Sequence, residues 1–71
     1  MINLEQAQEL YLTGKSLYEK EELDEAIFSF QRAIELNCQS FWAHHLLGCS
    51  FDKVGKQNEA IAAWQQAIKV D

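Results

Sequence analysis

A chain of 71 residues with a net charge of −5 has room for one small domain, spanning residues 1–71. Its composition, 48% hydrophobic and 24% charged with no proline, is typical of a globular helical protein rather than a disordered one. Residues 1–37 hold eight acidic and three basic side chains, whereas residues 38–71 hold three of each. Because no Lys/Arg cluster accompanies this acidic surplus, the charge pattern argues against a nucleic-acid partner.

The cysteines and the apolar segments favour a soluble cytoplasmic protein. Cys38 and Cys49 are well separated in the chain and match no CxxC pattern, which indicates free thiols in a reducing compartment. No apolar run approaches the roughly 18 residues of a membrane-spanning helix, and the first residues lack the charged-then-apolar pattern of a signal peptide. We therefore expect no membrane partner.

Two predicted helices lie on either side of an acidic turn. Apolar residues at helical spacing over 4–18 predict the first helix, and Asn3 with Gln6 forms the pattern of a capping box at its start. The acidic turn at 20–22 ends this helix, and renewed helical spacing predicts a second helix over 23–37.

Two further helices follow in the second half of the chain. Ser40 is expected to cap the N-terminus of a third helix over 42–54, and Gly55 to end it in the left-handed conformation. Apolar residues over 60–68 predict the fourth helix. Because the connections between the predicted helices are short, neighbouring helices must be antiparallel.

The second half of the chain repeats the first half at a fixed offset. Residues 7–37 align with residues 41–71 without a gap, so that Gly14 pairs with Gly48, and nine of the 31 pairs are identical. Average compositions would give about two identities by chance. Positions paired in this alignment are equivalent positions of the two repeats. A period of this length indicates stacked supersecondary units, each of which cannot bury its apolar face alone.

A glycine at the equivalent position of both repeats predicts a close approach between helices. Gly14 costs its helix roughly 1 kcal/mol relative to alanine, which calls for a packing reason. We expect Ala26 of the next helix to approach the glycine backbone, with Phe30 filling the space one turn on. The same interpretation applies to the equivalent residues of the second repeat.

This arrangement resembles the tetratricopeptide repeat, whose motif is W-x2-L-G-x2-Y, then A-x3-F, then a further alanine. The first copy reads Leu10-x2-Thr13-Gly14-x2-Leu17, Ala26-x3-Phe30 and Ala33, and the second reads His44-x2-Leu47-Gly48-x2-Phe51, Ala60-x3-Trp64 and Ala67. The resemblance implies an all-α fold, an α-α superhelix of two stacked antiparallel helix-turn-helix repeats over about 7–40 and 41–71. Glu21 departs from the pattern. The second repeat has Gly55 at this position, and a glutamate in the left-handed conformation there costs about 1 kcal/mol of stability.

The resemblance also implies a function, because the inner face of the first helix of each repeat binds extended peptides or a partner helix in this family. It therefore implies a protein–protein interaction module, a scaffold without enzymatic activity or cofactor. Tyrosine and tryptophan give large contact areas at low entropic cost, which favours apolar or aromatic anchors in the partner. The groove-facing residues that the resemblance implies are Gln8, Tyr11, Leu12, Lys15, Tyr18, Trp42, His45, Leu46, Cys49, Asp52 and Lys53.

Strongly acidic tails are not favoured as partners. One subclass of the family grips terminal carboxylates with a cluster of Lys, Arg and Asn. Only Lys15 and Lys53 could contribute here, and Leu12, Leu46 and Cys49 stand where that subclass has polar residues.

The two end faces of the predicted stack differ in polarity. Ala43, Leu47, Ser50 and Val54 form a stripe expected to pack on the second helix, whereas their counterparts in the first helix are Glu9, Thr13, Ser16 and Lys20. This polar stripe predicts that the first helix is an N-terminal cap.

The last helix is predicted to leave an apolar strip open. Its residues Ile61, Trp64 and Ile68 are the counterparts of three residues that the third helix should cover. An open strip of this kind is expected to be buried, either by a second copy in a homo-oligomer or by further chain. In the second case the chain is the N-terminal part of a longer array or of a repeat-tethered enzyme, without separate activity.

A small metal-binding or catalytic protein is the alternative from another class. His45, Cys49 and Asp52 share one helical face and could hold zinc, or act as base, nucleophile and orienting acid, with His44 or Cys38 nearby. Three ligands over two turns of one helix rarely converge on a tetrahedral centre, and no oxyanion donors lie beside the thiol. We therefore expect no metal and no catalytic site, with His44 directed into the core of its repeat.

Overall fold

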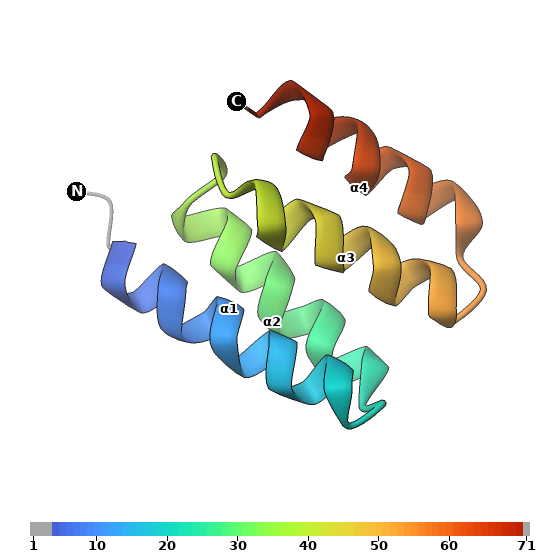
Figure 1. Ribbon diagram of the computed structural model, residues 1–71, viewed down its shortest axis with the longest axis horizontal. Helices are drawn as coiled ribbons and strands as arrows, with labels where there is room; N and C mark the ends of the chain where they lie inside the picture. Colours follow the sequence, from blue (N-terminus) through green and yellow to red (C-terminus); the bar gives the residue numbers. More distant parts are fainter. Residues whose placement is uncertain (1–3, 71) are drawn as a thin grey trace.

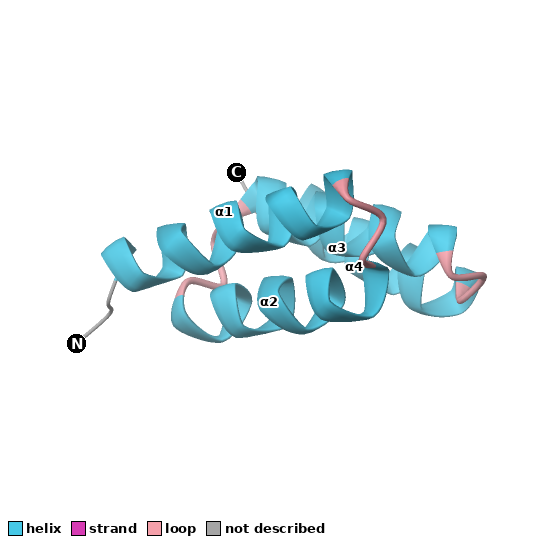
Figure 2. Cartoon of the chain, turned by 90° about the horizontal axis from the view of Figure 1, so that it is seen from below, coloured by secondary structure: helices cyan, strands magenta, loops and turns pink. Residues whose placement is uncertain are grey.

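The computed structural model describes residues 4–70, which form four helices lying side by side in chain order (Figure 1). The helices are α1 (Leu4–Glu19), α2 (Leu23–Leu36), α3 (Phe41–Lys53) and α4 (Gln57–Lys69). α1 packs on α2 and α3 packs on α4 as two hairpins, and contacts between α2 and α3 join the hairpins. Figure 2 shows α1 and α2 as two layers. The described residues contain no strand, so the predicted all-α class of stacked helical hairpins is confirmed.

Both hairpin turns use a residue in the left-handed conformation. Gly55 has a φ of 85°, and Glu21, at the equivalent position, has a φ of 64°. The N–H of Glu22 donates to the carbonyl of Leu17 with N···O 2.9 Å, and the equivalent bond from Lys56 to Phe51 has the same length. This bond defines a Schellman ending. The first turn is therefore closed in the same way as the second, although a side chain at this φ costs about 1 kcal/mol.

Ser40 caps α3 as the sequence predicts. Its Oγ accepts a hydrogen bond from the N–H of Ala43 with N···O 3.3 Å. Glu22 and Lys56, which precede α2 and α4, make no such side-chain bond. The capping box predicted from Asn3 and Gln6 involves a residue outside the described range.

The glycines at equivalent positions of α1 and α3 make room for aromatic rings, which corrects the expected packing. A Cβ built on Gly14 would lie 2.8 Å from two ring carbons of Phe30, and one built on Gly48 would lie still closer to the indole of Trp64. The nearest atoms are therefore those of the ring itself, not of the alanine one turn away. Each glycine thus allows a large side chain to lie directly against the helix backbone.

The main core lies at the junction of the two repeats. Its buried members are Ala26 and Phe30 of α2, Leu47 of α3 and Ala63 of α4. The stripe predicted to pack on the second helix is largely buried, since Ala43 and Ser50 have no exposed surface. The four counterparts of that stripe on α1 are exposed, as their polarity predicts.

Candidate protein-binding site

A hollow of about 240 Å³ lies between the two helices that begin the repeats. Tyr11 and Lys15 of α1 line one side, and Trp42 and Leu46 of α3 line the other. All four belong to the implied groove set, so the fold brings this part of the set together. Trp42 is 59% exposed, which leaves a large aromatic surface available to a partner.

Two neighbouring rings pack against Trp42. The ring of Phe41 lies 5.2 Å from the Trp42 ring and is nearly parallel to the ring of His45, with centroids 5.8 Å apart. The Trp42 and His45 rings meet edge to face at 5.6 Å. Sequence reasoning missed Phe41, although its place one helical turn before His45 puts the two on one face. The three rings therefore form one aromatic cluster beside the hollow.

Lys53 is engaged in contacts that cross from α3 to the first hairpin. Its Nζ lies 4.7 Å from the ring centroid of Tyr18 and 3.4 Å from Oε1 of Glu21. Both partners in the ion pair are largely exposed, so the pair adds less than about 1 kcal/mol to stability. Lys53 does not line the hollow, where Lys15 is a lining residue.

The other implied groove residues lie outside this hollow. Gln8 lines a smaller space of about 30 Å³ toward the C-terminal end of α2, together with Asn37 and Ser40. Leu12 is 51% exposed and Asp52 is exposed. Their role in binding remains a prediction.

The histidines and cysteines do not assemble a metal site. Sγ of Cys49 lies 3.7 Å from Nε2 of His45, one helical turn away. His44 is buried, as predicted, and its Nε2 lies 2.9 Å from the backbone oxygen of Cys38. No group of three His, Cys, Asp or Glu side chains within residues 4–70 is placed to hold a metal ion.

The predicted open strip of α4 is exposed in part. Ile61 and Ile68 are 49% and 79% exposed. Trp64 is only partly exposed because its indole lies against Gly48 and Nε1 donates to the carbonyl of His45 with N···O 3.2 Å. The prediction that Trp64 is an open member of the strip therefore needs correction, since most of this side chain is used inside its own repeat.

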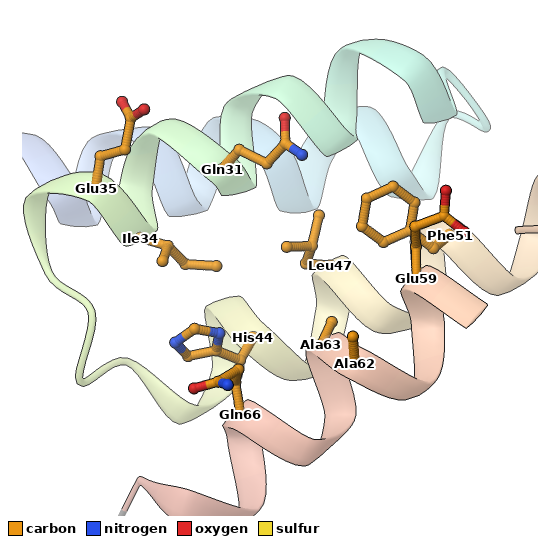
Figure 3. Close-up of a pocket in the computed structure, with 10 residues that line it drawn as sticks. All are labelled: Gln31, Ile34, Glu35, His44, Leu47, Phe51, Glu59, Ala62, Ala63 and Gln66. Atoms are coloured by element: carbon orange, nitrogen blue, oxygen red, sulfur yellow. The ribbon is translucent and has the colours of Figure 1, made fainter. Parts of the chain in front are cut away.

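A larger cleft of about 530 Å³ separates α2 from α4 and was not predicted (Figure 3). Gln31, Ile34 and Glu35 of α2 line one side, and α4 contributes Ala62 and Ala63. The floor comes from α3, including His44, Leu47 and Phe51. The adjacent small residues on α4 were the available signal, because they leave the space between the two helices unfilled.

Comparison with known families finds two matches. Residues 14–55 match a family model described as TPR repeat, and residues 43–71 match one described as Tetratricopeptide repeat. Comparison with curated proteins finds no match. Within residues 4–70, no helix is long and apolar enough to cross a membrane.

Proposed function

Because the chain belongs to the tetratricopeptide repeat family, whose repeats are typically non-catalytic protein–protein interaction modules, we propose that it binds a peptide or partner helix on the face formed by α1 and α3. The observation that carries the proposal is the hollow between Tyr11 and Trp42, whose tryptophan packs against two neighbouring rings. An aromatic side chain that is already ordered loses little further entropy on binding.

The size of this hollow favours side chains of a docked peptide over a small-molecule ligand. Its volume of about 240 Å³ is below the roughly 300–1,000 Å³ of typical small-molecule pockets. Its walls are mostly aromatic and aliphatic, with Lys15 as the cation. We therefore propose that the partner inserts one or two apolar or aromatic anchors.

A selection of peptides from a displayed random library tests this proposal. The selected peptides should carry an aromatic or large aliphatic anchor, and Trp42→Ala should weaken their binding about 30-fold, the effect of a hot spot of about 2 kcal/mol. Arg32→Ala is the matched control, since it also removes a long, half-exposed side chain but lies on α2. Equal effects of the two substitutions would refute the assignment of the face.

We also propose that the outer face of α4 is covered by a second copy of the chain. Ile61 and Ile68 support this, because exposed large apolar residues on one helix face are typical of an interface. Light scattering over a concentration series is the test, with Ile68→Glu as the variant. A strictly monomeric chain at high concentration would refute self-association.

A further inference from the structure

Within the chain, the second hairpin packs against α2 and covers its outer face. This contact shows how one repeat packs on the repeat before it. Ile27 and Ile34 of α2 pack against the core at this seam and are only partly exposed. Their counterparts in the second repeat are Ile61 and Ile68, at 49% and 79% exposure. The outer face of α4 is therefore the same kind of surface as that of α2, without a cover among the described residues.

A matching place exists at the other end of the molecule. Thr13 and Leu17 of α1 with Asp24, Glu25, Phe28 and Ser29 of α2 line a hollow of about 370 Å³. Most of these residues are equivalent to lining residues of the α2–α4 cleft, namely Leu47, Phe51, Glu59, Ala62 and Ala63. The two hollows are therefore the same place in the two repeats. In the second repeat α2 forms one wall of that place, as Figure 3 shows.

We propose that α4 of one copy docks in the α1–α2 hollow of a second copy, so that copies associate head to tail. This inference rests on the self-association proposed above and specifies the surface that covers α4. Within a chain the second repeat stacks on the first repeat. In the proposed contact, the first repeat of the next copy would stack on the second repeat in the same way. Such a contact is heterologous, and it leads to open-ended stacks rather than closed dimers.

Phe28, which lines the α1–α2 hollow, supports α4 of a second copy as its occupant. Within the chain, Ala62 leaves the cleft of about 530 Å³ unfilled. Phe28 holds the equivalent place in the first repeat and is 61% exposed, although it is a large apolar residue. In a head-to-tail contact its ring would occupy the corresponding space, next to Ile68 of the incoming helix. Two exposed apolar residues would be buried together.

The charges of the two faces are mixed. Lys69 on α4 is equivalent to Glu35 on α2, so the docking face carries an ammonium group where α2 carries a carboxylate. On the receiving face Glu9 stands at the place of Ala43, and Arg32 stands at the place of Gln66, which lines the cleft together with Glu35. At the internal seam Glu35 lines the same cleft as His44, the neighbour of Ala43. By the same shift the cleft neighbours of Lys69 in the next copy would be Leu10 and Arg32, so the contact depends on apolar burial and not on charge pairing.

The contact is expected to be reversible. The stripe of α1 at the receiving face is polar and exposed, and Thr13 stands there at the place of the buried Leu47, so less apolar surface is available than at the internal seam. Association should therefore rise with concentration rather than be permanent.

Complementation between two variants tests the head-to-tail arrangement with the whole chain. Phe28→Glu damages the receiving face and Ile68→Glu damages the docking face, and both side chains are mostly exposed, so circular dichroism should show intact helices. By sedimentation or light scattering, wild type should exceed the dimer mass, and each variant should be monomeric. An equimolar mixture should form a 1:1 dimer, because each variant keeps one intact face. Leu4→Glu, at 59% exposure, is the matched control and should associate like wild type.

Other outcomes would overturn either the head-to-tail arrangement or self-association itself. If Phe28→Glu still associates while Ile68→Glu does not, α4 pairs with something other than the hollow, and the head-to-tail inference fails while self-association stands. A mixture that remains monomeric also overturns the inference. A wild type that is monomeric at every concentration overturns both.

Discussion

Replacing Gly48 by alanine places a methyl group where the indole of Trp64 lies. Alanine gains about 1 kcal/mol of helix propensity over glycine. Overpacking of a filled site costs about 1–3 kcal/mol, and displacing the indole endangers its hydrogen bond to His45, which contributes about 1 kcal/mol. We expect the free energy of unfolding to fall by about 2 kcal/mol, which lowers Tm by roughly 8–16 °C.

Denaturation followed by circular dichroism measures this change, and two comparisons make it specific. Ser16→Ala, an exposed helical site, should be neutral or stabilise by up to about 0.5 kcal/mol. Trp64→Leu should reduce the cost of the alanine at position 48, so the double variant should be less destabilised than the sum of the single variants by about 1 kcal/mol. A stabilising effect of Gly48→Ala, or additive effects in the double variant, would refute the packing argument.

Three further predictions concern the turns, the helix cap and the aromatic cluster. Glu21→Gly should stabilise the fold by about 1 kcal/mol and Gly55→Ala should destabilise it by a similar amount, because the backbone at both positions has a left-handed conformation. Chemical denaturation measures both changes. Ser40→Ala should lower the free energy of unfolding by about 1 kcal/mol in the same assay, through loss of the α3 cap. Phe41→Ala should speed dissociation of a selected peptide by freeing Trp42; an unchanged rate would show that Phe41 does not hold it.

The helices, their ends and the repeat could be predicted from the sequence because they depend on short segments. A cap such as Ser40 or a left-handed residue such as Gly55 acts on backbone groups within a few positions along the chain. The repeat period then requires the two hairpins to be alike. Even the unfavourable φ of Glu21 could be predicted, because Glu21 is equivalent to Gly55 in the repeat.

The candidate site was predictable only as a set of residues. The family resemblance selected the groove-facing positions, but it did not distinguish Trp42, which lines the hollow, from Lys53, which contacts Tyr18 and Glu21. Phe41 was missed because its aromatic neighbours come from side-chain packing rather than from a motif position.

The sequence by itself determined the fold class, the order of the helices and the internal symmetry, whereas the tertiary structure decided which apolar residues remain exposed. Trp64 and Phe28 illustrate this, since the first turns onto Gly48 and the second stays on the surface. The physical reason is that exposure depends on which helix packs against a side chain. Side chains of different helices meet only once each hairpin has formed and the two hairpins have stacked.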